Sequence, residues 1–494
     1  MVESKKDVSV KVSIKFMFWV IVAGLFLAQL IFTFNSMGQL RYEEVAESIR
    51  NVFWLQKSFI YDGISSNVGW YGLLLIVYNI FGFSVNTAKI IRLFLSLMSI
   101  ISLALLLKKY FGEKAALVPL LAICLSPAML YFNTLQASFG IDLQYLFICL
   151  YLVDSLSSAG RNVFFIKEFL LWLLAMIAWM SYPSFIFYLP VIGILYIRNL
   201  LATKEQPLLF VHMAFSLTAF ILPLSAAFLL ISDKNLLIYD PVVRSGIFRG
   251  GGAFAPDIQI FFYNFGKLLS DIFIQANSYH FDLNSTEFSD IYPAAALIFV
   301  LIFSIWLAIR KRQIRFLLLL IWFSILFEVL FVNLTSGKPG MRRNTSLLAF
   351  IYALYTISWY YLFVKFKANI LRNAGLFLLL LIPLHHLLVF PGNVSHLNDR
   401  SPFRYDLFSE SNGNNSSKTL DQLVAASQNK EIQFACGDTT GNLKQCRYVE
   451  MYAAIAGYCY WNQLNCHLVK GYDSKSGRYV YLNPELWRSY YWDH

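Results

Sequence analysis

A short run of charged residues, RYEEVAESIR (Arg41 to Arg50), follows the first long apolar segment of the chain. Glu43 and Glu44 lie at its centre, and apolar residues recur at helical spacing from Val45 to Phe53. This pattern predicts an amphipathic helix on a membrane surface. Carboxylates at a lipid boundary lose hydration, which suits them to acid–base chemistry. An interfacial helix whose acids face the solvent is the alternative interpretation.

A further acid, Asp142, stands at the start of an apolar stretch, DLQYLFICLYLV. Ionisable groups beside or within a membrane span are costly, so an isolated carboxylate there is a candidate for function. The alternative is electrostatic, because an acid in the first turn of a helix complements the helix dipole. We expect Asp142 to lie at the outer end of a membrane helix.

Three cations, Lys338, Arg342 and Arg343, fall in a short turn, SGKPGMRRNT, between two apolar segments. The turn is expected on the outer side, where basic clusters are uncommon. Adjacent guanidinium groups suit a phosphate, because each binds it bidentately. Contact with lipid headgroups is the alternative interpretation of the same cluster.

A long segment, Ser232–Asp290, carries RSGIFRGGG, in which Arg244 and Arg249 precede or flank a run of three glycines. Glycine runs give backbone freedom, so the segment is interpreted as a lid loop or as a merely flexible connection. No Lys-Ser or Lys-Thr follows the glycines, which excludes a nucleotide-binding P-loop.

The composition is that of an integral membrane protein. Of 494 residues, 58% are hydrophobic and only 14% are charged, whereas a soluble domain has about 25% charged residues. The net charge of +11 comes mainly from short clusters between apolar segments. That distribution follows the positive-inside rule and predicts no nucleic acid partner.

A membrane-crossing helix needs about 20 mostly apolar residues. We expect a helical membrane protein with eleven spans, at about 14–34, 88–107, 115–132, 139–156, 166–181, 183–199, 208–231, 291–309, 316–334, 345–364 and 374–390. The apolar segment 68–83 is interpreted as non-spanning, because only then do the basic loops nearly all face the cytoplasm. The protein is expected in the cytoplasmic membrane, with its N-terminus on the cytoplasmic side and its C-terminus on the outer side.

Three parts are expected along the chain. They are a membrane domain (1–390), a polar linker (391–418) and a small extracytoplasmic α/β or α+β domain (419–494) with alternating polar and apolar residues. Four of the six cysteines fall in the last part: Cys436, Cys446, Cys459 and Cys466. Two disulfides of unassigned pairing are expected there. A zinc site that also uses His467 is the alternative, although the spacing contains no C-x-x-C pair.

The order of these features resembles the polytopic membrane glycosyltransferases of the GT-C superfamily, such as protein O-mannosyltransferases and lipid A aminoarabinose transferases. RYEEVAESI looks like the helix of their first outer loop, and residues 81–117 look like the segment that enters their second span. LSPAMLYFNTLQASFGIDLQYL resembles the segment where an outer acid precedes the fourth span, and Asp142 stands at that acid. GKPGMRRNTSLLAF resembles an outer turn that carries an arginine.

The resemblance implies transfer of a sugar from a polyprenyl-phosphate donor to a lipid, glycan or protein acceptor at the outer face of the cytoplasmic membrane. When RYEEVA is aligned on its tyrosine and alanine, the family's Asp-Glu pair falls on Gly38 and Gln39. Neither residue can act as a base, so Glu44 or Glu43 is expected to take the place of the family's catalytic acid pair. Asp142 would help to position the acceptor.

The resemblance further implies that Arg342 and Arg343, aided by Lys338, bind the donor phosphate. The Ser232–Asp290 loop would close over the lipid donor. No cofactor is certain, and a divalent cation remains open. Two other functions stay open as well: an inert scaffold that retains the fold, and a transporter or flippase of a lipid-linked saccharide.

Overall fold

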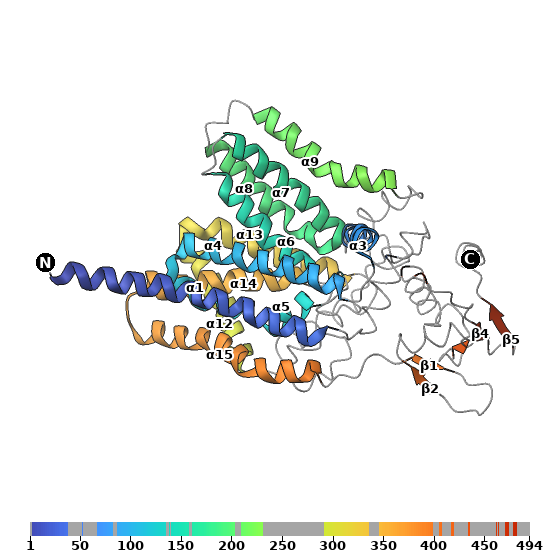
Figure 1. The fold of residues 1–494 in the computed structure, drawn as a ribbon. Coiled ribbons are helices and arrows are strands. Elements are labelled where there is room, and N and C mark those ends of the chain that lie inside the picture. Colours follow the sequence, from blue (N-terminus) through green and yellow to red (C-terminus); the bar gives the residue numbers. More distant parts are fainter. Residues whose placement is uncertain are drawn as a thin grey trace. The chain divides into compact units, whose positions relative to one another are not determined.

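The computed structural model is built mainly of long apolar helices (Figure 1). It describes residues 2–37, 52, 67–82, 86–134, 138, 140–157, 161–202, 209–230, 291–334 and 345–398, and, in the C-terminal region, 405–407, 416–418, 433–434, 461, 463, 470–473 and 478–481. The predicted residues Glu43, Glu44, Arg244, Arg249, Lys338, Arg342, Arg343 and the four C-terminal cysteines lie outside the described residues.

The helical elements, in chain order, are α1 (Val2–Ser36), α3 (Val68–Phe81), α4 (Thr87–Cys124), α5 (Pro127–Thr134), α6 (Ile141–Leu156), α7 (Arg161–Ser181), η3 (Pro183–Phe187), α8 (Leu189–Ala202), α9 (Leu209–Leu230), α12 (Ile291–Arg310), α13 (Arg312–Leu334), α14 (Thr345–Tyr360), η7 (Tyr361–Lys365) and α15 (Ile370–Asn398). Among the described residues, five helices are long and apolar enough to cross a membrane. They begin at residues 14, 87, 162, 346 and 370. The protein is therefore an integral membrane protein.

The helices differ from the predicted spans in detail. Helix α4 contains two helical parts that meet at a kink at Gly112, inside the loop expected at 107–114, and the glycine's φ of 75° there suits a residue without a Cβ. The expected span 115–132 is instead interrupted between α4 and α5, at Leu125 and Ser126. Pro127 explains the break, since proline disfavours helical geometry in the residue before it. The apolar segment expected not to span forms α3, which has 14 residues.

Contacts divide the chain into two compact units, and the predicted boundaries at 390 and 418 stay a prediction. The first unit comprises 1–36, 65–70 and 89–398. The second comprises 37–64, 71–88 and 399–494. The second unit contains five short strands in the order β2-β1-β3-β4-β5, namely β1 (Tyr405–Leu407), β2 (Ser416–Lys418), β3 (Gln433–Phe434), β4 (Lys470–Asp473) and β5 (Arg478–Tyr481). Only the β3–β4 pair is parallel among these strands.

Within the first unit, α6 packs against α7 and α8, and α7 packs against α9. A second group is centred on α12, which contacts α13, α14 and α15, and α14 joins this group to α6. Two hydrogen bonds fix α14 between its neighbours. The Trp359 indole donates to the carbonyl of Ala115 on α4 at 2.9 Å, and the Tyr355 hydroxyl donates to the carbonyl of Leu379 on α15 at 2.9 Å.

Helices α6 and α7 run in opposite directions, which defines two ends of the first unit. At one end, Tyr145 near the start of α6 interacts with Ser181 at the end of α7. At the other end, Lys167 near the start of α7 donates to the carbonyl of Ser155 at 3.2 Å. We call these the Asp142 end and the Asp154 end, after the first and last acids of α6.

Candidate active site

Asp142 is the one residue of the predicted site that the structure describes. Helix α6 begins after Gly140, whose φ of 67° and crowded position against the Phe132 ring both favour glycine. Asp142 therefore occupies the first turn of the helix, as the sequence predicts. Its side chain is fully buried, and its Oδ2 accepts a hydrogen bond of 2.7 Å from the Ser184 hydroxyl.

The partner Ser184 is held by a short 3-10 helix, η3, that follows α7. Tyr182 is extended before Pro183, with φ −152° and ψ 121°, as expected for a residue that precedes proline. The chain thus turns sharply and returns in α8, which places Ser184 and Tyr188 against the start of α6. Tyr188 is buried, and its ring contacts that of Phe350 on α14 at 5.6 Å.

A second buried acid, Glu328 on α13, contacts the first turn of α14. Its Oε1 accepts hydrogen bonds from the Ser346 hydroxyl at 2.5 Å and from the Leu347 backbone N–H at 3.2 Å. Both donors belong to the first turn of α14, whose unpaired N–H groups and dipole favour a carboxylate. The Glu328 side chain is fully buried, and its Oε2 has no hydrogen-bond partner among the described residues.

The two acids belong to one group of side chains. The Tyr188 hydroxyl faces Asp142 and the Ser346 hydroxyl, and the two carboxylates are close enough to act on each other electrostatically. We call Asp142, Ser184, Tyr188, Glu328 and Ser346 the acidic cluster. The cluster draws residues from α6, η3, α13 and α14. It includes the first turns of α6 and α14 and the hydroxyl groups of Ser184 and Ser346, which donate to the acids.

Two buried cations stand at the same end of the unit, on the first turns of α4. Lys89 Nζ donates to the carbonyl of Ser36 at the end of α1. Arg92 Nη2 donates to the carbonyl of Phe132 on α5 at 2.8 Å, and its guanidinium lies 5.5 Å from the centre of the Trp70 ring. Both side chains are almost fully buried. The Asp142 end thus combines acids and cations out of contact with solvent.

A chain of amides connects the elements that carry these charges. Gln144 on α6 donates to the Ser96 hydroxyl at 2.6 Å and to Asn133 Oδ1 at 2.8 Å. Asn133 in turn donates to Gln29 Oε1 on α1 at 3.0 Å. Ser96 also donates to the carbonyl of Arg92 at 2.8 Å. Buried polar groups are costly unless they are hydrogen-bonded, so this network fixes α1, α4, α5 and α6 in one arrangement.

Several residues of this end were not predicted as site residues: Lys89, Arg92, Ser184, Tyr188, Glu328 and Ser346. The sequence held a signal for Glu328, since it is a lone acid inside an apolar helix. Lys89 and Arg92, three apart in an otherwise apolar segment, held a similar one. As for metals, the described residues contain no group of three or more His, Cys, Asp or Glu side chains that could hold an ion.

A different buried acid, Glu168 on α7, lies toward the Asp154 end. His212 Nδ1 and Glu168 Oε2 are 2.8 Å apart, and both side chains are fully buried. Glu168 Oε1 accepts hydrogen bonds from the hydroxyls of Tyr196 and Ser216, the second at 2.8 Å. The Phe165 ring stacks on the imidazole with centres 4.6 Å apart. We call Glu168, Tyr196, His212 and Ser216 the Glu168 cluster, which joins α7, α8 and α9.

Comparison with known proteins adds no assignment to this geometry. No protein-family model matches the chain, and a search of curated proteins finds no significant match.

Proposed function

We propose that the protein is a membrane glycosyltransferase that moves a sugar from a polyprenyl-phosphate donor to a lipid, glycan or protein acceptor. The observation that carries this proposal is the acidic cluster. Asp142, the acid at which the sequence resembles GT-C enzymes, is fully buried, and so is Glu328, the other acid of the same cluster. Buried carboxylates, which have lost their hydration, are typical of acid–base sites.

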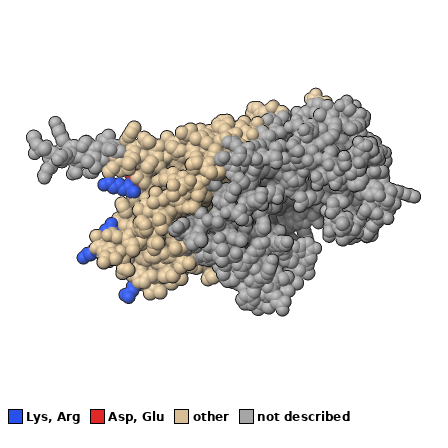
Figure 2. Space-filling view, turned by 90° about the horizontal axis from the view of Figure 1, so that it is seen from below, with Lys and Arg blue, Asp and Glu red and all other residues tan. Residues whose placement is uncertain are grey.

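The proposed topology has eleven spans, with the N-terminus in the cytoplasm and a small C-terminal α/β or α+β domain outside. In that arrangement the start of α6, η3, the end of α13 and the start of α14 all belong to the outer face, so the acidic cluster is an outer-face site. The described residues support this orientation, because Figure 2 shows their exposed Lys and Arg side chains gathered at one end of the described part, as expected for a cytoplasmic side.

The chemical step is a substitution at the anomeric carbon of the sugar. An acceptor oxygen forms a bond to that carbon, and the bond from the carbon to the phosphate oxygen breaks. Polyprenyl phosphate leaves with the bonding electrons, and the acceptor proton passes to a carboxylate. Glu44 or Glu43 is proposed as that base, while Asp142 orients the acceptor hydroxyl through its own hydrogen bond.

Glu328 is proposed as a second orienting acid. Its Oε1 is occupied by Ser346 and Leu347, whereas Oε2 can still accept a hydrogen bond from an acceptor hydroxyl. Arg342 and Arg343, with Lys338, are proposed to hold the donor phosphate and to stabilise the charge that develops on it as it leaves. The loop that contains Arg244 and Arg249 is proposed to close over the donor.

The experiment is a transfer assay with the purified full-length protein in detergent, radiolabelled polyprenyl-phosphate sugars and a membrane extract as acceptor. The proposal predicts labelled product with at least one donor. It also predicts that the double variant Arg342→Ala/Arg343→Ala loses transfer while keeping the same elution volume on gel filtration. Absence of transfer with every donor tested would show that the enzyme assignment is wrong.

A transporter or flippase of a lipid-linked saccharide is the second candidate function, and one observation favours it. The Glu168–His212 pair, on α7 and α9, is a further buried acid toward the Asp154 end. Ionisable groups spread through a membrane domain are typical of transport pathways. Vesicles that contain the protein distinguish the two functions. A transporter moves the intact lipid-linked saccharide between leaflets, whereas a transferase releases polyprenyl phosphate.

A further inference from the structure

The Asp154 end carries a concentration of positive charge that the proposed reaction does not use. The segments 291–327 and 345–398 contain seven lysines and arginines and no Asp or Glu. Six of these cations are exposed: Arg310, Lys311, Arg312, Arg315, Lys365 and Lys367. They lie at the α12–α13 junction and after α14, and Figure 2 shows exposed Lys and Arg gathered at one end of the described part.

Arg315 and Arg372 hold this end in place. Arg315 donates to the carbonyls of Ala308 at 2.9 Å and Ile309 at 2.8 Å, at the end of α12. Arg372 donates to the carbonyls of Leu362 at 3.0 Å and Phe363 at 3.4 Å. The terminal carbonyls of a helix need such partners, and cations there also complement the helix dipole. The two junctions that display the exposed cations are therefore fixed by hydrogen bonds.

Stacked aromatic rings lead along α12 to the same place. Phe299 and Phe303 stack with centres 5.5 Å apart, and Phe303 stacks on Trp306 at the same separation. Phe366 then contacts Trp306 at 5.5 Å, and Lys311 Nζ lies 5.9 Å from the centre of the Phe366 ring. The ladder is half-buried or exposed along its length, with Trp306 37% exposed. An apolar track on a membrane helix thus ends at a cation.

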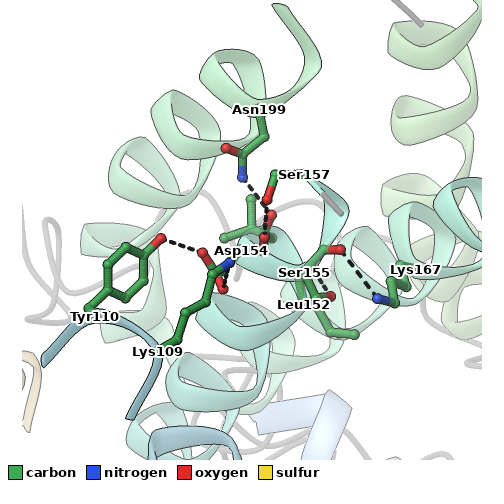
Figure 3. A network of polar contacts seen from close by, with 9 residues as sticks. Lys109, Tyr110, Leu152, Asp154, Ser155, Ser157, Lys167 and Asn199 are labelled. Carbon is green, nitrogen blue, oxygen red and sulfur yellow. Dashed lines mark hydrogen bonds and ion pairs between the residues drawn. The ribbon is translucent and has the colours of Figure 1, made fainter. Parts of the chain in front are cut away.

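The basic segment 108–114 differs, because two of its three lysines pair with acids. Lys109 pairs with Asp154 at 2.7 Å, and the Tyr110 hydroxyl donates to the same carboxylate (Figure 3). Lys108 pairs with Glu113 at 2.8 Å. The cations at the α12–α13 junction and after α14 have no acid within the segments 291–327 and 345–398, and none of the ion pairs among the described residues involves them.

We propose that this surface, formed by Lys311, Lys367, Phe366, Trp306, Phe303 and Phe299, binds an acidic phospholipid. The phosphate of the headgroup lies between Lys311 and Lys367, and an acyl chain follows the aromatic ladder along α12. Basic pockets between membrane helices bind acidic headgroups in this manner. The combination of cations with a membrane-embedded apolar track favours a lipid over a soluble anion.

The test titrates the full-length protein in non-ionic detergent with phosphatidylglycerol and, separately, phosphatidylcholine, and counts bound lipid by native mass spectrometry. The wild type is expected to prefer phosphatidylglycerol. The variant Lys311→Gln/Lys367→Gln is expected to bind it about twenty-five-fold more weakly, since each lysine at an acidic lipid surface contributes about fivefold. Trp306→Ala is expected to weaken binding of both lipids.

The matched control is Lys15→Gln/Lys114→Gln, which removes two other exposed lysines from the described residues. It is expected to keep the affinity of the wild type. An equal loss in both double variants, or no preference for phosphatidylglycerol, would overturn the proposal. Displacement of the lipid by an excess of inorganic phosphate would also overturn it, because the surface would then recognise phosphate without the acyl chain.

Discussion

The acidic cluster and the Glu168 cluster both bury acids between membrane helices, yet they use the carboxylate oxygens differently. Both oxygens of Glu168 have partners, which come from α8 and α9. In the acidic cluster, Glu328 uses only Oε1 among the described residues. A carboxylate with all its partners within the protein mainly holds helices together, whereas one with an unused oxygen can receive a substrate group. The comparison therefore supports a stabilising role for Glu168 and is consistent with the proposed chemical role of the acidic cluster.

The largest expected effect comes from Asp142→Asn. The amide keeps the size of the side chain but cannot accept a proton or orient an acceptor as a carboxylate does, so transfer should fall about a thousandfold. The matched control is Asp154→Asn on the same helix, whose acid pairs with Lys109, and it should keep transfer within a few-fold. Initial rates with radiolabelled donor measure both. Equal loss in the two variants would remove Asp142 from the proposed site.

The next effect tests the stabilising half of the comparison. Glu168→Gln removes a fully buried carboxylate that contacts His212 and accepts hydrogen bonds from Tyr196 and Ser216, and disturbing such a buried network costs about 2 kcal/mol. The thermal midpoint in detergent should therefore fall clearly, while transfer measured well below that midpoint should change little. A variant with normal stability and lost transfer would move the chemistry to this cluster and favour the transport function.

The sequence predicts part of this arrangement, for reasons that particular residues make clear. Apolar runs predict the helices, and a single acid before an apolar run correctly places Asp142 at the first turn of α6. Glu328 could have been found by the same rule, because it interrupts the apolar helix α13. Its role could not, since Ser346 reaches it only through the packing of α13 on α14.

Partners that lie far apart in the chain explain most of what the sequence did not predict. Ser184 contacts Asp142 across 42 positions, and His212 contacts Glu168 across 44. Serines and tyrosines are common in membrane helices, so nothing in their local pattern marks these particular ones. Helix boundaries were limited in the same way. The kink at Gly112 lies within the expected loop, but the local charges do not predict how few residues depart from helical geometry.

A smaller effect is expected from Glu328→Gln. The amide oxygen can still accept the hydrogen bonds from Ser346 and Leu347, so the free energy of unfolding should fall by only about 1 kcal/mol. Transfer should nevertheless fall about tenfold, because the amide replaces an acid that orients the acceptor. Rate and thermal midpoint, measured on one preparation, separate the two effects. If stability fell as far as in Glu168→Gln and transfer did not change, Glu328 would be a structural acid like Glu168.

The smallest effect concerns Lys109→Gln, which sharpens the comparison by adding a pair that water reaches. The Lys109 side chain is 47% exposed and that of Asp154 is 11% exposed, so their ion pair should stabilise the fold by less than about 1 kcal/mol. Salt screens exposed pairs far more than buried ones. The wild-type midpoint should therefore approach that of Lys109→Gln as salt is raised, while the gap between wild type and Glu168→Gln persists. A gap for Lys109→Gln that does not shrink in high salt would mean that the two pairs stabilise the helices in the same way.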